Sequence, residues 1–382
     1  MKVSVLKENL KKGLNIVEKA VGRNLSLPIL NNVLVVGEKN FLNLITTDLE
    51  LAFGYWILTK IEKEGKLTVP ARLFSNLVNL FPNETINLEA KDAFLSLESG
   101  NYQTQLKTTP VDDFPLLPKV KNGDSIQVNN LPFIEGLERV VDFTSPTASR
   151  PEISGVFLSF QKKSVTMATT DSFRLAEKQI FFEKPIAKEY SFIVPQRAAR
   201  ELVNTLGGRG GKLTIYLSPN QILFEFPMEE VSHPQIQIFS RLIEGDYPDY
   251  KTIVPQKYKT QAILPRIDFL NQLRTAGIFS GKTNEINLKI DPKKNEVEIS
   301  GQTPEVGQSQ STLTGKIKGE KIDISFNWRF LTDGLSQMES PEVVFELTER
   351  EGEGKEKEEG PALLRPSNDP SYLYIVMPTK SS

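Results

Sequence analysis

The chain has 382 residues, about two to three times the usual length of one domain, and 39% of them are hydrophobic. A disordered or fibrous chain is therefore excluded. Lys and Arg (46) nearly balance Asp and Glu (48), so the net charge of -2 provides no overall attraction to nucleic acid. There is no cysteine and only one histidine, His233. The absence of cysteine excludes a disulfide framework, a cysteine metal site and thiol catalysis. A single histidine excludes a multi-histidine metal site and leaves a Ser-His-Asp triad without a spare base.

The N-terminal residues predict a cytoplasmic protein. Charges at Lys2 and Lys7 come too early for the apolar core of a signal peptide. The most apolar stretch, 41–58, contains Asp48 and Glu50, so we expect no membrane span and no membrane partner.

The chain repeats itself. Thr46-Thr47-Asp48 recurs 123 residues later as Thr169-Thr170-Asp171, and Gly13-Leu14 recurs at the same offset as Gly136-Leu137. Further along, Val69-Pro70-Ala71-Arg72 recurs as Val194-Pro195-Gln196-Arg197 at an offset of 125. An offset that only grows is expected if loops were inserted into one copy.

A third copy is weaker but recognisable. Gln272-Leu273 corresponds to Gly136-Leu137, and Met377-Pro378 corresponds to Tyr247-Pro248. Three copies account for the whole chain, and we place their boundaries near residues 121 and 256. The predicted domains are 1–121, 122–255 and 256–382.

Each copy is predicted to contain two helices. The first helix has apolar residues at helical spacing around Leu10, Phe133 and Leu270, with Asn130 as the N-cap in the second copy. The second helix has the same spacing around Phe74, Leu202 and Leu335.

Alternating apolar residues predict strands between and after the helices. Examples are Ile86-Asn87-Leu88, Leu213-Thr214-Ile215 and Ile286-Asn287-Leu288. Residues 349–360 consist of charged residues and Gly, which predicts a solvated hairpin tip or loop. The fold class is therefore α+β, with three tandem repeats of one domain, each carrying two helices on β-sheets.

Charge is distributed unevenly along the chain. The six predicted helical segments carry a net charge of +6, which leaves -8 for the remainder. If the helices share one surface, that surface is basic and suits sequence-independent contact with a phosphate backbone. Ordinary solvated amphipathic helices would give the same numbers, so charge alone does not decide the function.

Several short motifs, taken together, resemble the bacterial DNA polymerase III beta subunit family, the sliding clamps. They include Ser26-Leu27-Pro28-Ile29-Leu30-Asn31-Asn32, Thr170-Asp171-Ser172-Phe173-Arg174-Leu175-Ala176, Tyr247-Pro248-Asp249-Tyr250 and Val376-Met377-Pro378. They stand in the order and spacing of that family over the full chain. The resemblance implies a head-to-tail homodimer of three-domain subunits, a six-domain ring with helices lining the hole and sheets outside.

The resemblance also implies the function and the partners. We expect a processivity factor without intrinsic catalysis or cofactor, which encircles double-stranded DNA and slides on it. Its protein partners would be a second copy, the replicative polymerase catalytic subunit, the clamp loader and other proteins with a clamp-binding motif.

Three groups of residues follow from this expectation. The candidates for the DNA-facing lining are Lys12, Lys19, Arg23, Arg72, Arg150, Arg197 and Arg200. The residues that match the two sides of the family's dimer interface are Thr104 and Leu106 in the first copy and Ile278 and Phe279 in the third. The residues that match the family's client-peptide pocket are Ile153, Thr170, Ser172, Arg174, Leu175, Pro248, Thr252, Ile253, Met377, Pro378 and Thr379.

Other interpretations stay open at the level of sequence. Phe173, Thr252 and Thr379 depart from the residues common in the family, and the 349–360 insertion is long. An enzyme could use Asp48, Asp171, Arg174 and Glu152 as an acid-base cluster, although an Asp after Thr at a strand end more often shapes a turn. A repeat scaffold that binds proteins without encircling DNA is the other alternative.

Overall fold

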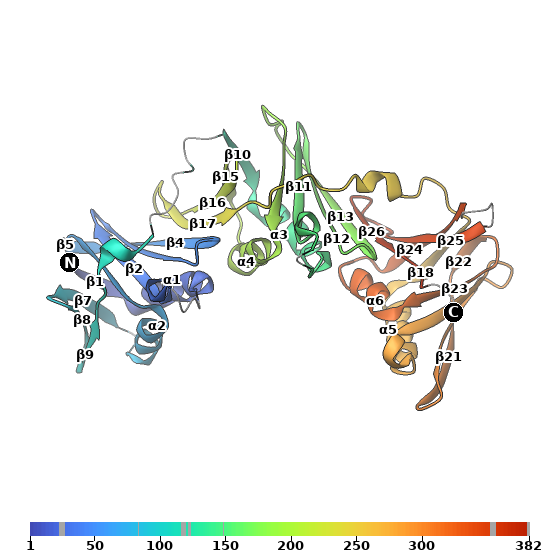
Figure 1. Ribbon diagram of the computed structural model, residues 1–382, viewed down its shortest axis with the longest axis horizontal. Helices are drawn as coiled ribbons and strands as arrows, with labels where there is room; N and C mark the ends of the chain where they lie inside the picture. Colours follow the sequence, from blue (N-terminus) through green and yellow to red (C-terminus); the bar gives the residue numbers. More distant parts are fainter. Residues whose placement is uncertain are drawn as a thin grey trace. The chain divides into compact units, whose positions relative to one another are not determined.

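One order of elements occurs three times along the chain (Figure 1). The computed structural model describes residues 1–22, 27–82, 84–115, 120, 124–147, 149–351 and 357–379. Each copy has the order strand, helix, three strands, a strand leading into a second helix, and three final strands. The first and third copies have one additional short strand, β5 or β22.

The elements of the first copy are β1 (Lys2–Leu6), α1 (Lys7–Val17), β2 (Asn32–Glu38), β3 (Phe41–Thr47), β4 (Leu51–Leu58), β5 (Lys60–Lys63), β6 (Gly65–Pro70), α2 (Ala71–Leu80), β7 (Thr85–Lys91), β8 (Phe94–Ser99) and β9 (Tyr102–Lys107). Those of the second are β10 (Asp124–Asn129), α3 (Asn130–Glu138), β11 (Gly155–Gln161), β12 (Ser164–Thr170), β13 (Arg174–Phe181), β14 (Tyr190–Pro195), α4 (Gln196–Leu206), β15 (Lys212–Ser218), β16 (Gln221–Pro227) and β17 (Pro234–Arg241). Those of the third are β18 (Thr260–Pro265), α5 (Arg266–Ile278), β19 (Glu285–Asp291), β20 (Glu296–Thr303), β21 (Gly307–Thr314), β22 (Lys316–Gly319), β23 (Ile322–Asn327), α6 (Trp328–Ser336), β24 (Glu342–Glu351), β25 (Lys357–Pro366) and β26 (Tyr372–Val376). The triplication inferred from sequence offsets is therefore present in the fold.

Strand pairing repeats as well. In each copy the first strand pairs with the strand that follows the second helix, giving β1–β7, β10–β15 and β18–β24. The three strands after the first helix form a meander, and its first strand also pairs with the strand that leads into the second helix. One copy therefore contributes to two sheets.

The chain forms two compact units. The first contains Met1–Glu135 and Arg197–Ile243, and the second contains Gly136–Gln196 and Glu244–Ser382. The predicted three-domain boundaries stay a prediction, because the compact units divide the central copy between them.

The first unit holds a five-stranded sheet, β5-β1-β7-β8-β9, and an eight-stranded sheet, β10-β15-β16-β17-β4-β3-β2-β6. The larger sheet joins two copies through the antiparallel pair β17–β4, in which Phe239 lies opposite Ala52. Helices α1 and α4 lie on the same side of this sheet (Figure 1).

The second unit is built in the same way. It holds a nine-stranded sheet, β14-β11-β12-β13-β26-β25-β24-β18-β22, and a four-stranded sheet, β21-β20-β19-β23. Here the antiparallel pair β13–β26 joins the second copy to the third, and Leu175 lies opposite Ile375.

The helices pack on the sheets through the faces that the sequence predicts. Leu10, Leu14 and Val17 on α1 are fully buried, and each such side chain contributes about 1.5–3 kcal/mol through burial. The repeated glycine has a steric cause. A Cβ at Gly13 would come within 2.7 Å of Tyr55 on β4, and one at Gly136 within 2.5 Å of Ile180 on β13.

One local prediction needs correction. Asn130 is not an N-cap. Its side-chain Nδ2 donates to the backbone carbonyls of Leu206 (3.0 Å) and Arg209 (2.7 Å), and its side-chain Oδ1, the atom that would accept in an N-cap, has no hydrogen-bond partner. It binds the end of α4, where the Leu206 carbonyl also accepts the N–H of Arg209 at 3.2 Å. The 349–360 segment agrees with the predicted hairpin, since Glu349–Glu351 and Lys357–Glu359 pair as the ends of the antiparallel strands β24 and β25. Residues 352–356 lie outside the described residues.

Candidate functional site

The repeated Thr-Thr-Asp motif forms the same turn in both copies. Thr46 donates to the carbonyl of Val17, the last residue of α1, and Thr169 donates to that of Val140, two residues after α3 ends. The next threonine, Thr47 or Thr170, donates to the carbonyl four residues ahead, at 3.1 Å and 2.7 Å. The motif thus fixes a strand end to a helix and then reverses the chain.

The aspartates complete these turns. Asp48 Oδ1 accepts from the backbone N–H of Glu50 (3.1 Å) and Leu51 (2.8 Å). Asp171 Oδ1 accepts from Phe173 and Arg174, both at 3.0 Å. The expectation of turn chemistry is confirmed.

A basic cluster lies in the first unit between η1 (Glu18–Ala20), α4 and the β3–β4 turn. Arg197 donates to Asp48 Oδ2 and, at 3.1 Å, to the carbonyl of Lys19. Its side chain stays 52% exposed. Lys19 donates to Thr205 Oγ1 at 2.8 Å and lies 3.6 Å from Glu201. Burial lowers the pKa of Lys19, and Glu201 opposes that effect.

Other predicted lining residues differ in exposure. Lys12 on α1 and Arg72 on α2 are exposed, whereas Arg200 on α4 is half-buried. Helices α1 and α2 are in contact, so Lys12 and Arg72 lie on neighbouring elements. Arg23 lies outside the described residues.

Arg150, in the second unit, has a different environment. Its guanidinium contacts Glu152 Oε1 at 3.2 Å and donates to Ser172 Oγ at 3.1 Å. Ser172 belongs to the predicted client-peptide group, so the structure places Arg150 beside that group.

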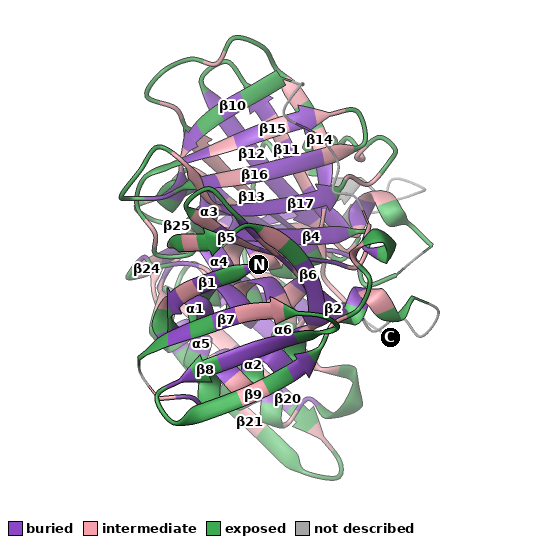
Figure 2. Cartoon of the chain, turned by 90° about the vertical axis from the view of Figure 1, so that its left-hand side faces the viewer, coloured by how far each residue is buried: buried purple, intermediate pink, exposed green. Residues whose placement is uncertain are grey.

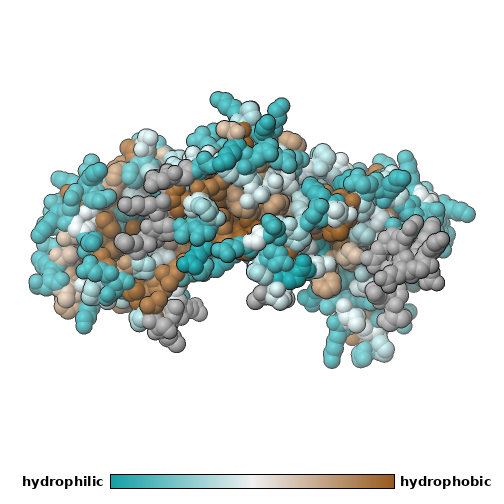
Figure 3. All heavy atoms as spheres, turned by 45° about the horizontal axis from the view of Figure 1, so that its top comes forward, coloured by the Kyte–Doolittle hydropathy of each residue, from teal (hydrophilic) through white to brown (hydrophobic). Residues whose placement is uncertain are grey.

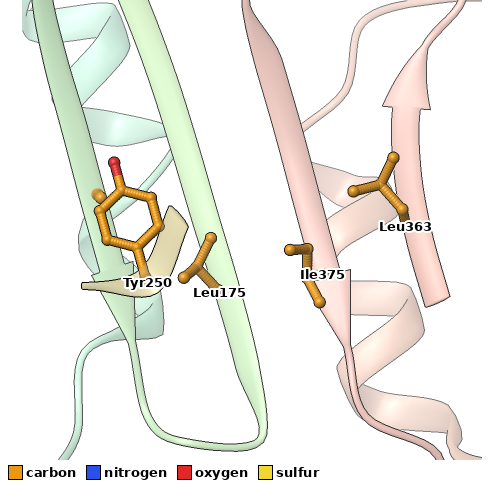
Figure 4. Close-up of a cluster of buried hydrophobic side chains, with 5 residues drawn as sticks. Leu175, Tyr250, Leu363 and Ile375 are labelled. Carbon is orange, nitrogen blue, oxygen red and sulfur yellow. The ribbon is translucent and has the colours of Figure 1, made fainter. Parts of the chain in front are cut away.

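An apolar cluster lies under the predicted client surface. Ala168, Leu175, Tyr250, Leu363 and Ile375 are all buried and pack together. Figure 4 shows Leu175 and Ile375 facing one another from β13 and β26, with Leu363 on β25 and Tyr250 on the short helical segment η7 (Tyr250–Ile253). Only Leu175 of this cluster was among the predicted site residues. The pairing of β13 with β26 brings in Leu363 and Ile375, and sequence alternation alone gave no sign of that pairing.

Tyr250 is fixed by polar contacts at the edge of the cluster. Its hydroxyl donates to Glu177 Oε2, and Lys251 Nζ lies 2.7 Å from the same oxygen. Burial raises the pKa of Tyr250, and the Glu177 carboxylate raises it further, so the hydroxyl stays a neutral donor.

Arg174 is held from two sides. It lies 2.9 Å from Asp171 and 2.6 Å from Asp333, and its guanidinium stands 4.6 Å from the ring centre of Phe330. The side chain is only 14% exposed, so its position is fixed before any ligand arrives.

The structure gathers several other predicted client residues near this cluster. Met377 donates its N–H to the Phe173 carbonyl at 2.9 Å, which places Met377 and Pro378 beside the β12–β13 turn.

The predicted client residues differ in exposure. Met377, Pro378 and Thr379 are half-buried, Thr252 is exposed and Ile253 is 50% exposed. Pro248 accepts from the N–H of Tyr250 at 2.7 Å. Ile153 is fully buried and can act only from beneath the surface.

The predicted interface residues lie at two sheet edges. β9 is the last strand of the five-stranded sheet and is largely exposed (Figure 2). Thr104 on β9 is half-buried and Leu106 is 4% exposed, so Leu106 packs within its own unit. Ile278 is 69% exposed at the end of α5, and the Phe279 ring lies beside Gly307 at the start of β21.

Each acid named for the enzyme alternative has a structural partner within its own unit. Asp48 and Asp171 use their carboxylates in turns and ion pairs, and Glu152 pairs with Arg150. Among the described residues, no group of three or more His, Asp or Glu side chains is placed to hold a metal ion. Within the same part of the chain, no helix is long and apolar enough to cross a membrane.

Three tandem copies of one α+β domain, each with two helices on β-sheets, define a three-domain repeat protein. Family models of the DNA polymerase III beta subunit match its N-terminal domain over residues 1–118, its central domain over 128–249 and its C-terminal domain over 251–380. The chain therefore belongs to the DNA polymerase III beta subunit family.

Curated relatives agree with this assignment. The chain is 29% identical to the beta sliding clamp of Synechococcus elongatus, over 99% of both chains, and 26% identical to that of Bacillus subtilis, over 100% of both. The crystal structure of the Bacillus subtilis DNA polymerase sliding clamp matches with a TM-score of 0.91 at 26% identity, over 100% of both chains. The Thermotoga maritima beta subunit, at 22% identity and a TM-score of 0.88, shares the fold.

Proposed function

We propose that two copies of this chain close a head-to-tail ring around duplex DNA and slide on it without reading sequence. The ring holds the replicative polymerase catalytic subunit on its template, receives the clamp loader and other client proteins, and performs no chemistry itself. It works in the cytoplasm. Membership of the beta subunit family and the threefold repeat support this proposal, and neither favours a scaffold that binds only proteins.

The observation that carries the ring is an incomplete pattern of strand pairing. The first unit joins two copies through β4 and β17, and the second joins two through β13 and β26. The corresponding strands for a third junction are β21 and β9. In the described part of the chain, each is the outermost strand of its sheet. We infer that β21 of one subunit pairs with β9 of the other.

The side chains near these edges support a pairing of unlike surfaces. Exposed strand edges favour association, and Ile278 and Phe279 add apolar surface next to β21. Thr104 offers its side chain on β9, whereas the buried Leu106 contributes its backbone edge. Two such junctions close a dimer, because each subunit carries one of each edge.

The lining of the ring is proposed from charge and exposure. Lys12, Arg72 and Arg197 are exposed enough to meet phosphates, and Arg200 and Lys19 stand next to Arg197 on α4 and η1. Contacts of this kind are weak, salt-sensitive and blind to sequence, which permits sliding while the closed ring prevents loss. Arg23 and Arg150 stay in the proposal as predicted lining residues.

Clients are proposed to dock on the surface around Leu175 and Ile375. The apolar floor is surrounded by the exposed Ile253 and the half-buried Met377 and Pro378. A polar border is provided by Thr170, Ser172 and Arg174. Such a surface suits an extended peptide of the Gln-Leu-x-Leu-Phe type, with Met377 adapting to different side chains.

Cysteine cross-linking tests the head-to-tail arrangement, because the chain has no native cysteine. Thr104→Cys and Ile278→Cys are made singly and together. We expect mild oxidation to link two chains only when one carries Thr104→Cys and the other Ile278→Cys. Disulfide formation within a single-variant preparation would indicate like surfaces in contact and would contradict the proposal.

A further inference from the structure

A groove lies in the first unit, where β4 meets β17. It has a volume of about 270 Å³, close to the lower end of the range of about 300–1,000 Å³ for small-ligand sites. Leu49, Ala52 and Phe239 provide apolar surface, and Glu50, Ser240 and Arg241 provide polar groups. In Figure 3, hydrophobic side chains gather left of centre, over the part of the eight-stranded sheet that contains this junction.

The backbone around this groove repeats that of the client surface in the second unit. The N–H of Arg241 donates to the Glu50 carbonyl at 3.0 Å, as the N–H of Met377 donates to the Phe173 carbonyl at 2.9 Å. Leu49 has a φ of 80° and the corresponding Ser172 a φ of 78°. The buried cluster Ala52, Val120, Leu223 and Phe239 takes the place of the cluster around Leu175, Leu363 and Ile375.

The side chains differ in a consistent way. In the first unit, Ala52 stands where the second unit has Leu175, and Phe239 stands where it has Ile375. A smaller residue therefore lies opposite an aromatic ring in the first unit. Arg241 takes the position of Met377, which puts a cation at the rim. The two junctions therefore share a backbone and differ in the side chains at their surface.

Two features make the groove of the first unit suitable for a ligand. Leu49 is 42% exposed, and the Thr47-Asp48 turn holds it in a left-handed backbone conformation, so an apolar side chain stands at a fixed place on the surface. Arg241 pairs with Glu50 at 3.4 Å, but both side chains are more than half exposed. A pair of this kind is weak, so an incoming carboxylate can replace Glu50.

We propose that this groove is a second peptide-docking site, which takes an extended segment of a partner protein with apolar residues followed by an acidic one. The apolar side chains contact Leu49, Ala52 and Phe239, and the acidic residue pairs with Arg241. The proposal depends on the proposed clamp function in one respect: the protein that carries the segment is a partner of a clamp.

Methyl NMR on the full-length chain tests the proposal with reporters in both units. The probe is the peptide acetyl-Ser-Leu-Phe-Asp-Gly-amide, and its control carries Lys in place of Asp. The Ala52 methyl reports on the groove, and the Leu175 methyls report on the client surface. We expect the probe to shift the Ala52 signal and the Lys control to shift it at about fivefold higher concentration or not at all.

Two variants and one matched control localise the site without unfolding the chain. Leu49→Gly removes one apolar wall and suits the left-handed backbone, so we expect at least fivefold weaker binding without loss of thermal stability. Ser172→Gly makes the matched change in the second unit and should leave the Ala52 response unchanged. Arg241→Glu should reverse the preference, so that the Lys peptide binds better than the Asp peptide.

The outcomes separate this proposal from the clamp function. No shift at Ala52, or a shift that survives both Leu49→Gly and Arg241→Glu, would overturn the second site. If a Gln-Leu-Ser-Leu-Phe peptide shifts only the Leu175 methyls while the acidic probe shifts nothing, the client surface stands and the second site is wrong.

Discussion

Arg197 and Asp48 form an ion pair that joins α4 to the β3–β4 turn. Asp48 shapes its own turn with Oδ1 and binds Arg197 with Oδ2, so one carboxylate has two structural roles. The guanidinium is positioned by this pair yet keeps 52% of its side chain exposed. A cation held in this way can meet a phosphate without first ordering its side chain.

Changes at this pair should alter DNA binding in opposite directions. Arg197→Ala removes one cation, so we expect weaker binding to linear duplex and a salt slope smaller by at most about 0.9. Asp48→Asn keeps an Oδ1 acceptor for the turn and removes a competing negative charge, so binding should become slightly tighter. Affinities are measured by fluorescence anisotropy over a series of salt concentrations.

The matched control is Lys318→Ala, which removes an exposed cation on β22 at the edge of the nine-stranded sheet. It should leave the salt slope unchanged. If Lys318→Ala and Arg197→Ala weaken binding equally, the attraction is a general charge effect and α4 is not part of the lining.

The environment of Glu18 should make the free energy of unfolding depend on pH. Burial raises the pKa of Glu18, and Ser75 and Arg72 only partly oppose that. A carboxyl group with a raised pKa in the folded state favours folding below its unfolded pKa, and this contribution is lost as the pH rises through the folded pKa. Glu18→Gln should therefore raise the melting temperature at neutral pH and have little effect below about pH 4. An equal effect at both pH values would exclude this cause.

Dimer formation should depend on the apolar residues beside β21. Changing Ile278 and Phe279 together to Glu places charge against the partner edge, so we expect a monomer of 42.9 kDa where the unmodified protein has twice that mass. Native mass spectrometry at micromolar concentration measures this. Phe181→Glu changes a residue of similar exposure (68%) on β13 and should leave the dimer intact. A dimer that survives the double change would contradict the proposed interface.

Client binding should depend on Ile253 more than on an equally exposed isoleucine elsewhere. Ile253→Ala removes an apolar edge of the client surface, and we expect at least fivefold weaker binding of a fluorescent Gln-Leu-Ser-Leu-Phe peptide. Ile253 is 50% exposed and Ile267 on α5 is 51% exposed, so Ile267→Ala is a matched control. Equal loss in both variants would place the peptide somewhere else.

Deletion of residues 377–382 is a harsher test of the same surface. It removes the hydrogen bonds from Met377 to Phe173 and from Thr379 to Ser325, both at 2.9 Å. The melting temperature is therefore compared first. Unchanged peptide affinity in a deleted chain of similar stability would remove Met377 and Pro378 from the site.

Much of the fold could be read from the sequence, because repeated residues have repeated structural duties. Thr46 and Thr169 bind the corresponding backbone carbonyl in their copies, and Gly13 and Gly136 leave room for a side chain on a neighbouring strand. The apolar faces of α1 and α2 were likewise predicted from spacing and are buried.

The contacts that could not be predicted from the sequence depend on pairing between strands far apart in the chain. Leu363 and Ile375 join the apolar cluster around Leu175 only because β13 pairs with β26, about two hundred residues later in the chain. Asn130 was misassigned because an N-cap needs an acceptor oxygen, whereas the fold uses its N–H groups on the end of α4. The partners of Arg197 and Lys19 also come from distant segments, and local spacing carries no signal for them.

Encirclement of DNA is tested most directly by topology. The double variant Thr104→Cys/Ile278→Cys is mixed at low concentration with closed circular duplex, oxidised, and washed at about 1 M salt, where the Debye length is about 3 Å and phosphate contacts are screened. We predict that covalently closed rings stay on the circle, are released when a single cut makes the DNA linear, and are never retained on linear duplex. Equal retention on circular and linear DNA, or none on the circle despite complete cross-linking, would contradict the clamp.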